Sequence, residues 1–580
     1  MVLRSCRFVG SRLGVWGLLL AAAISGPAMA DPLVQLARVG PSGTTSDSFV
    51  TDTSVILRIQ KSLATIGFYR GPVDGRADVE LQSSIRAYQK RSGFKIDGLA
   101  TEDLAIHLET ASQVDVLLRR LDKARTQHID AARNALLANE ATRNLVGADD
   151  SEVADPTRDP SPCFRNPTPA CLLAEASESA KAIDRADMRD WARGELLAAQ
   201  AKGGFTDQAM STVRRISDPR LVIVALRDIA DGLARAGKTD DAMAAAEIIP
   251  DPLKKADALG QIAAIALKRD DKAAAEKAAR ALAEVGRSLK EPLRRVQYWS
   301  RAAGILEQVG QRGEAQVLID WSDALARTRV PLDERGAAFR YIAMAFADSG
   351  RPEVALKRSE DIADAQDRTS VVVAVAMSLA DSGNVDRALA TAQGISEARY
   401  RAVVLSHIAI AQIKAGRRAD AAQTVAQARA LTDEIKTHFA AAFAVSRVAL
   451  AQTELAKAAK TDFADAIETA RFIKDEPLRA HVLWTIAAEQ RKAGNSSAAA
   501  KTEDHARQAS GDIRSPLSQV WMYGDFSLSL LAQGEGEAAW VAFRNGLKVA
   551  ESLTNAWGRA RALSKLAATL SDLPTAIARP

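Results

Sequence analysis

The sequence has few cysteines, few aromatic residues and almost no excess of charge of either sign. Three of its 580 residues are cysteine, aromatic residues make up 5%, and 77 lysines and arginines face 72 acids. This balance, without a basic run, gives no indication of nucleic-acid binding. Few aromatics together with abundant alanine favour closely packed helices over sheets. A chain of this length is too long for one core, so several domains or a repeat array must share it.

Long apolar runs are also absent beyond the first thirty residues, although a bilayer-spanning helix needs roughly 20 apolar residues. The start of the chain combines Arg4, Arg7 and Arg12 with a mostly apolar stretch at residues 13–24 and small residues at 27–30. This pattern predicts an export signal, residues 1–30, cleaved after Ala30. A retained membrane anchor is the alternative. Cleavage would leave a periplasmic protein with no integral membrane segment.

Two cysteines remain after the predicted cleavage. Cys163 and Cys171 lie in a short proline-rich stretch, and exported proteins meet an oxidising environment, so we expect a local disulfide between them. A metal pair or a reactive thiol is the alternative. None of the six histidines is near either cysteine, which disfavours a metal site.

Residues 31–50 are rich in Ser, Thr, Gly and Pro and predict a flexible leader. From residue 51 to 110, three short helical patterns occupy residues 55–66, 81–88 and 104–108, with Thr101 placed to cap the third. Glycine-rich loops at residues 67–75 and 93–98 separate them, and each ends in Asp-Gly. These features predict a compact three-helix module.

The motifs of residues 51–110 resemble the peptidoglycan-binding-domain-like family, a three-helix module of cell-wall enzymes and envelope proteins. The resemblance rests on Ile59, Gln60, Leu63, residues 67–69 and 73–75, Ile85, Tyr88, Gln89, Gly93, Asp97 and Gly98. The family usually follows the first Asp-Gly with an aromatic-Gly pair and a Thr that opens the second helix. Residues 76–80 lack both, and we expect Asp78 to cap that helix instead.

The resemblance implies peptidoglycan as a ligand. An exposed groove with polar donors and aromatic faces would suit a wall polymer. The candidate contacts are Tyr69, Arg70, Asp74, Tyr88, Gln89 and Asp97. The alternative is structural, since Asp74 and Asp97 can close their turns and Tyr88 can fill the core.

Two segments connect the module to the rest of the chain. Residues 111–146 have apolar positions at helical spacing and predict one long amphipathic connector helix. Residues 147–170 are acidic and proline-rich and predict a linker that carries the first of the two cysteines.

Residues 171–578 repeat at intervals of 33, 40 or 45 residues. The repeat is anchored at Gly204, Gly237, Asp270, Gly310, Gly350, Gly383, Gly416, Thr461, Gly494 and Gly534. Alanine follows each anchor by five residues, at Ala209, Ala242, Ala275, Ala315, Ala355, Ala388, Ala421, Ala466, Ala499 and Ala539. Each unit therefore predicts two helices joined by a turn, with small residues where the helices cross.

These offsets resemble degenerate tetratricopeptide repeats, although the aromatic residues of that family's first helix are mostly replaced here. The resemblance implies an all-α solenoid with a curved surface for a protein partner. The first helix, near Leu172, would have no preceding repeat to cover it. We expect the disulfide loop to act as its cap.

One sequence motif suggests chemistry that its context contradicts. Residues 232–239 satisfy the phosphate-loop pattern, which works only after a strand, whereas Gly237 here is a repeat turn after a helical pattern. We expect no nucleotide binding, no cofactor and no metal site. The aromatic residues near the C-terminus are expected to serve core or end packing, with a protein interface as the alternative: Trp484, Trp521, Tyr523, Trp540 and Trp557.

The sequence therefore predicts a non-catalytic envelope adaptor, a small three-helix module followed by a long helical-hairpin solenoid. The module would bind peptidoglycan and the solenoid an unidentified envelope protein. The alternative is a cell-wall-modifying enzyme, or an accessory subunit of a wall hydrolase, with a site among the repeats.

Overall fold

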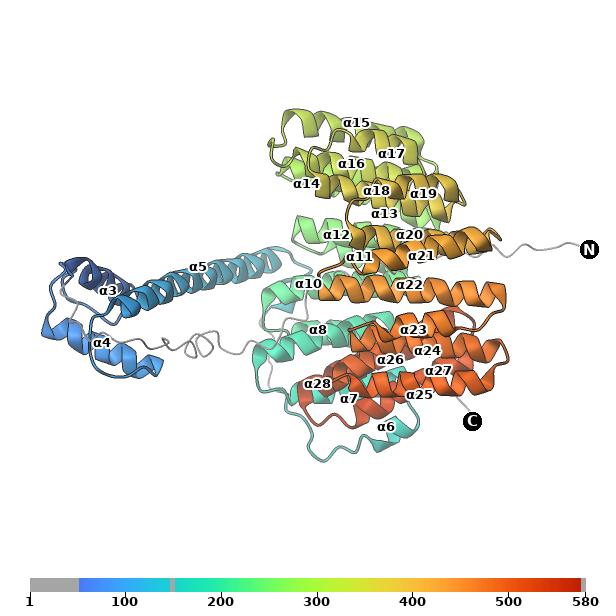
Figure 1. The fold of residues 1–580 in the computed structure, drawn as a ribbon. Helices are drawn as coiled ribbons and strands as arrows, with labels where there is room; N and C mark the ends of the chain where they lie inside the picture. Colours follow the sequence, from blue (N-terminus) through green and yellow to red (C-terminus); the bar gives the residue numbers. More distant parts are fainter. Residues whose placement is uncertain (1–51, 147–151, 575–580) are drawn as a thin grey trace, which may run out of the picture. The chain divides into compact units, whose positions relative to one another are not determined.

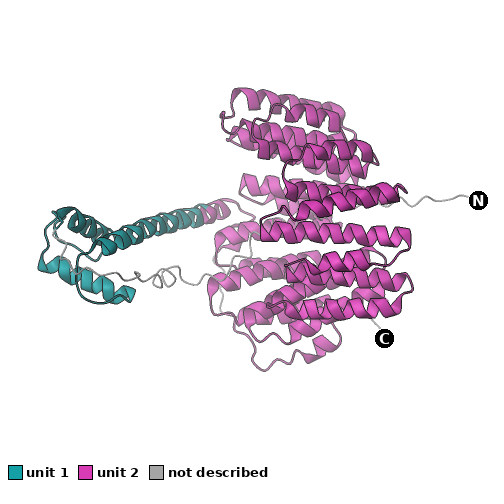
Figure 2. Ribbon diagram, in the orientation of Figure 1, with its two compact units in different colours: residues 1–131 teal, residues 132–580 magenta. Residues whose placement is uncertain are grey.

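The computed structural model describes residues 52–146 and 152–574, and all regular secondary structure in these ranges is helical (Figure 1). The chain divides into two compact units, residues 1–131 and 132–580 (Figure 2). The predicted export signal and leader lie outside the described residues. Within those residues, no helix combines the length and apolar character needed to cross a membrane.

The first unit contains α3 (Thr53–Thr65), α4 (Val79–Ser92) and the start of α5 (Glu102–Ala138). Side-chain oxygens cap the starts of α4 and α5. Asp78 accepts a hydrogen bond from the Leu81 amide at 2.6 Å, and Thr101 accepts one from the Leu104 amide at 3.2 Å. Both predicted caps are therefore confirmed. Between these helices, Ile59, Leu63 and other apolar side chains form a small separate core.

Helix α5 is a single helix where the sequence predicted two. The predicted third helix of the module and the connector helix at 111–146 are continuous from Glu102, and the helix ends at Ala138. No proline or glycine interrupts this stretch, so nothing stops the helix near Thr110. A short 3₁₀ turn, η1 (Arg143–Leu145), follows. Leu136 and Leu145 are buried in the core of the second unit.

The second unit is a series of helical hairpins preceded by two helices, α6 (Ser161–Arg165) and α7 (Pro169–Lys181). The hairpins of the first half are α8 (Ala186–Lys202) with α9 (Thr206–Arg214), α10 (Pro219–Arg235) with α11 (Thr239–Glu247), α12 (Pro252–Lys268) with α13 (Lys272–Ser288), α14 (Pro292–Val309) with α15 (Arg312–Thr328), and α16 (Arg335–Asp348) with α17 (Pro352–Ser359).

The second half continues in the same way. Its hairpins are α18 (Ala365–Asp381) with α19 (Val385–Gln393), α20 (Ala398–Lys414) with α21 (Arg418–Thr432), α22 (His438–Ala459) with α23 (Ala464–Arg471), α24 (Glu476–Lys492) with α25 (Ser496–Asp512), and α26 (Pro516–Ala532) with α27 (Gly536–Glu551). One further helix, α28 (Ala556–Leu570), follows.

The repeated alanines are buried, as the sequence predicted. Each alanine five residues after an anchor is at most 2% exposed. Most anchors adopt positive φ, where glycine is favoured. One anchor is corrected. The residue with positive φ after α22 is Lys460, not Thr461, because this turn has extra residues before α23 begins at Ala464.

The hairpins form a closed series. The first helix of each hairpin contacts the first helix of the next, from α8 through α10, α12 and so on to α28, and α28 contacts α8. Helix α7 packs along α28 and takes the place of the second helix of that hairpin. The two helices lie side by side in Figure 1, although α7 precedes all the other hairpins in sequence. The last hairpin of the described residues is thus built from both ends of the repeat region.

Apolar packing and ion pairs hold this junction together. Leu172 and Leu173 of α7 share one core with Leu563 and Leu566 of α28. The Arg561 guanidinium lies 2.6 Å from the Glu195 carboxylate of α8. The same guanidinium lies 4.4 Å from the centre of the Trp557 ring and 5.4 Å from that of Trp521.

A second polar contact joins the two ends. The Lys202 ammonium, at the end of α8, donates to the Ala568 carbonyl and lies 2.6 Å from the Asp572 carboxylate. The expectation of an uncovered first helix is therefore wrong, since α28 covers α7. The C-terminal aromatic residues serve packing, as predicted, with Tyr523 and Trp540 buried and Trp484 and Trp521 packed against the cores at this end.

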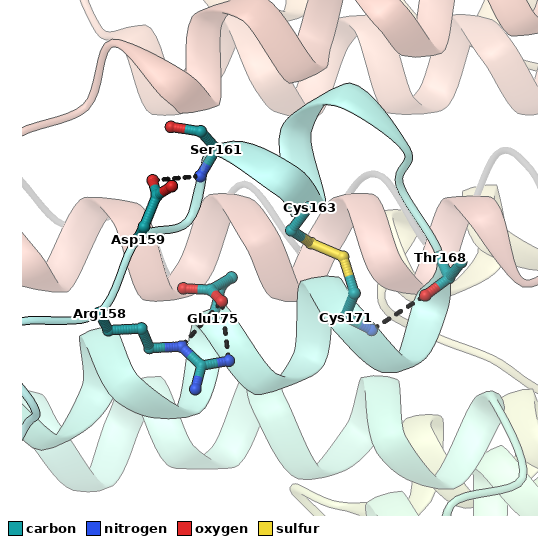
Figure 3. The surroundings of a disulfide bond; sticks show 7 residues. All are labelled: Arg158, Asp159, Ser161, Cys163, Thr168, Cys171 and Glu175. Carbon is teal, nitrogen blue, oxygen red and sulfur yellow. Dashed lines mark hydrogen bonds and ion pairs between the residues drawn. A yellow bond between two sulfur atoms is a disulfide. The ribbon is translucent and has the colours of Figure 1, made fainter.

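A disulfide joins Cys163 of α6 to Cys171 of α7, with their Cα atoms 5.8 Å apart (Figure 3). Around it, Thr168 caps α7 by accepting from the Cys171 amide, and Arg158 pairs with Glu175. Cys163 is only 8% exposed and belongs to the core shared by α7 and α28. The predicted disulfide is confirmed, but it braces a helix that is already covered.

Candidate functional site

In the first unit, a buried glutamine locks the first Asp-Gly turn. Gln60 of α3 is fully buried, and its amide oxygen accepts a hydrogen bond from the Gly75 amide at 2.8 Å. The amide nitrogen of Gln60 donates to the Arg76 carbonyl at 3.0 Å and to Asp74 Oδ1 at 3.3 Å. Gly75 has φ of +77°, which suits a residue without Cβ.

The second Asp-Gly turn is locked in the same way. The amide oxygen of Gln89, in α4, accepts from the backbone amides of Asp97 and Gly98 at 3.1 and 2.9 Å. Its nitrogen donates to Asp97 Oδ1 at 2.8 Å. The two turns of the module thus use one device, a helix glutamine that satisfies the donors and acceptors of the loop after it.

The acid of each turn takes part in closing that turn. The Arg76 amide and Gln60 donate to Asp74, and these hydrogen bonds lower the pKa of that carboxyl. At Asp97, burial acts to raise the pKa of the carboxyl, but hydrogen bonds from the Leu99 amide and Gln89 outweigh it, so the pKa is lowered overall. Both carboxylates stay ionised and close their turns, which is the structural alternative that the sequence left open.

The two tyrosines proposed as ligand contacts are buried. Tyr69 is 2% exposed, and its hydroxyl donates to the Pro72 carbonyl at 2.9 Å. Tyr88 is 7% exposed, and its hydroxyl lies 2.9 Å from His107 Nε2. Burial raises the pKa of both tyrosines. Of the six predicted contacts, only Arg70 and Asp74 are exposed, while Asp97 is half-buried.

A cluster of half-buried rings, which the sequence analysis did not single out, joins the three helices of the module. Phe68 packs edge-on against Tyr88, and Phe94 packs edge-on against His107. The exposed Arg91 guanidinium lies 5.5 Å from the centre of the Phe68 ring. We call Phe68, Phe94, His107 and Arg91 the aromatic cluster. Its signal in the sequence is a Gly-Phe pair after each of the first two helices.

This cluster combines apolar ring surface with a cation and a neutral imidazole. Burial lowers the pKa of His107, so its ring is uncharged near neutral pH. Rings with accessible faces and nearby hydrogen-bonding groups suit sugar or peptide ligands. The cluster and the exposed Arg70 are therefore the side chains of this module best suited to contact a polymer.

The phosphate-loop pattern at residues 232–239 is a hairpin turn, as expected. Helix α10 runs through its first residues, Gly237 makes the turn with φ of +79°, and α11 begins at Thr239. Gly232 is required for packing, because a Cβ there would lie 2.8 Å from the Cβ of Ala201 in α8. No group of three or more metal-ligating side chains occurs among the residues that the structure describes.

The substitution Ala242→Leu is expected to lower the free energy of unfolding by roughly 1–3 kcal/mol, because Ala242 is fully buried at a helix crossing and a larger side chain overpacks it. The control is Lys238→Ala, an exposed residue of the same turn that should leave stability unchanged. Urea unfolding of both variants measures the difference. ATP binding that disappears in Lys238→Ala would contradict the assignment of this turn.

One comparison with known proteins finds a family match within the first unit. Residues 53–108 match the family described as "Putative peptidoglycan binding domain". No curated protein matches the sequence. Ton1535 from Thermococcus onnurineus NA1, a crystal structure, is 16% identical, with 57% of this chain and 97% of that chain covered and a TM-score of 0.27.

A second solved structure is a circular tandem repeat protein with novel repeat topology and enhanced subunit contact surfaces. It is 14% identical, with 90% of this chain and 96% of that chain covered and a TM-score of 0.13. Because both scores are low, the closed arrangement of hairpins rests on the contacts described above.

Proposed function

We propose that this protein is a non-catalytic adaptor of the cell envelope, which binds peptidoglycan through residues 53–108 and a protein partner through its helical hairpins. The family match at residues 53–108 is the observation that carries the first half. The aromatic cluster and Arg70 would make the contacts, while Gln60 and Gln89 hold the loops that present them.

An exposed aromatic surface on α15 supports the second half. Val317 and Trp321 are four residues apart and therefore on one face of the helix, and they are 44% and 42% exposed. Arg287 of α13 lies over the Trp321 ring at 5.2 Å. Tryptophan and arginine side chains commonly anchor protein interfaces. The periplasm is the compartment in which both ligands would be met.

Sedimentation with purified peptidoglycan tests the wall-binding half. We expect Arg70→Ala/Arg91→Ala to weaken binding by about thirtyfold or more, because each of the two arginine contacts to a ligand contributes on the order of 1–2 kcal/mol. Lys61→Ala/Lys90→Ala removes the same charge from exposed positions of the same module and serves as the control. If a chain lacking residues 51–110 sediments as well as the intact protein, the module is not the wall anchor.

The same sedimentation assay tests the partner when envelope extract is added, and it tests the enzymatic alternative when the purified chain is used alone. An envelope protein that accompanies the intact chain should be lost with Trp321→Ala, which leaves the wall-binding module untouched. An enzyme would instead release soluble wall fragments during the incubation. Such fragments, produced by the purified chain alone, would replace the adaptor proposal with that of a wall-modifying enzyme.

A further inference from the structure

A polar cavity of about 240 Å³ lies among α19, α20 and α21. Side chains from all three helices line it, including Leu389, Arg401, Leu405, Gln412, Arg417 and Asp420. The cavity is too small for a large cofactor, but it would hold a molecule of the size of a modified amino acid.

Gln412 is the unusual residue of this cavity. It is fully buried, and within the described part of the chain neither its amide oxygen nor its amide nitrogen has a hydrogen-bond partner. A buried amide without partners costs roughly 1–3 kcal/mol. Equivalent positions, four residues before the turn residue of positive φ, mostly carry buried apolar side chains: Leu233, Ala266, Leu306, Phe346, Leu379, Ala456 and Leu530. The fold therefore does not need a polar group here.

Two other hairpins have glutamine at this position. Among the described residues the buried amide oxygen of Gln490 also lacks a partner, whereas a neighbouring side chain satisfies Gln200. In the α8–α9 hairpin, Gln200 accepts a hydrogen bond from the Thr212 hydroxyl at 2.9 Å. The equivalent threonine beside Gln412 is Thr424, whose hydroxyl donates instead to the Asp420 carbonyl at 2.9 Å. Gln412, which is among the residues that line the cavity, is thus left with a buried amide oxygen and amide nitrogen that have no partner among the described residues.

Arg401 also departs from the pattern of its repeat. The arginine at the fourth residue of a first helix commonly donates to the carbonyl six residues before it, as Arg189 does to Ile183 and Arg368 to Ile362. Arg401 has the same place in α20 but makes no such bond to Ile395. Its Nε is buried without a partner, and it lines the cavity.

The remaining polar groups define the chemistry that would fit. Arg417 is already paired, with Asp386 at 2.8 Å and with Asp420 at 2.7 Å. Among the residues that the structure describes, Arg401 forms no ion pair, so it is the cation available to an anion. Gln412 can both donate to and accept from an amide group. Leu389 and Leu405 add a short apolar wall.

We propose that this cavity binds a small carboxylate that also carries an amide, such as an N-acylated amino acid. Arg401 binds the carboxylate and Gln412 pairs with the amide. This site does not depend on the peptidoglycan-binding module, and its success or failure is independent of the adaptor function.

Calorimetric titration of the purified full-length protein with N-acetylalanine, in both enantiomers, tests the proposal. We expect saturable binding of at least one enantiomer, and at least about tenfold weaker binding of acetate and of N-acetylalaninamide, because each lacks one of the two groups. Equal affinity for N-acetylalaninamide would overturn the role of the carboxylate. No saturable heat with N-acetylalanine at millimolar concentration would mean a cavity filled by water only, and would overturn the site.

Two variants make the result specific. Gln412→Leu introduces leucine, which two other hairpins carry at this position as Leu233 and Leu379. This variant should therefore fold normally and bind N-acetylalanine at least about tenfold more weakly. Gln490→Leu, the same change at the equivalent position of the α24–α25 hairpin, should bind as the unmodified protein does. Undiminished binding by Gln412→Leu would refute the assignment, and thermal unfolding of both variants confirms that each is folded.

Discussion

The substitution Leu566→Ala in α28 is expected to lower the free energy of unfolding by about 2–5 kcal/mol and to loosen α7 as well as α28. Leu566 is fully buried in the core that α28 shares with Leu172 and Leu173 of α7. Removing its side chain loses the transfer free energy and leaves a cavity. Since α7 completes the last hairpin, the damage should reach a helix almost 400 residues away in sequence.

Hydrogen exchange measures this coupling directly. Amides of α7 and α8 should exchange faster in Leu566→Ala than in the unmodified protein. Leu282→Ala, a fully buried leucine of α13, is the matched control and should loosen the α12–α13 hairpin while leaving α7 protected. Unchanged protection of α7 in Leu566→Ala would show that the two ends of the repeat region do not fold together.

Replacing both disulfide cysteines, as Cys163→Ser/Cys171→Ser, is expected to lower the free energy of unfolding by roughly 2–3 kcal/mol, from the entropy of a loop of this length. An open array would confine the loss to the hairpins near Gly204 and Gly237. Because α6 and α7 pack on α28, the C-terminal hairpins should loosen too. Phe164, next to Cys163, lies against Arg559 of α28 and extends this contact.

Thermal unfolding with and without reductant, combined with hydrogen exchange, tests this prediction. Reductant should lower the melting temperature of the unmodified protein and leave the double variant unaffected. Mass spectrometry of the non-reduced protein supplies the independent check. Free thiols at both cysteines would contradict the bond, and loosening confined to α8–α11 would contradict its link to the C-terminal end.

In the first unit, the sequence predicted the turns and helix caps better than it predicted which side chains are exposed. The Asp-Gly turns and the cap at Asp78 depend on local backbone chemistry, which sequence motifs record directly. Burial depends on how the helices pack. Tyr69, Tyr88 and Gln89 therefore looked like ligand contacts in the sequence, although all three are buried. His107 was not singled out, because only packing brings it against Phe94 and Tyr88.

For the repeat region, the sequence by itself determined the hairpins. Alanine at a fixed offset from each turn predicted the helix crossings, since helices approach closely only where side chains are small. Local periodicity can reveal such units because each hairpin is formed by residues close in sequence.

Only the tertiary structure decided that the series closes and that α7 belongs with α28. The contacts responsible, such as Arg561 with Glu195 and Leu566 with the core of α7, join residues far apart in sequence. A periodic sequence pattern indicates that each hairpin packs against an apolar neighbour on both sides. It does not indicate which helices pack against the terminal hairpins. In the structure α28 contacts both α8 and α7, so the last unit packs against the first.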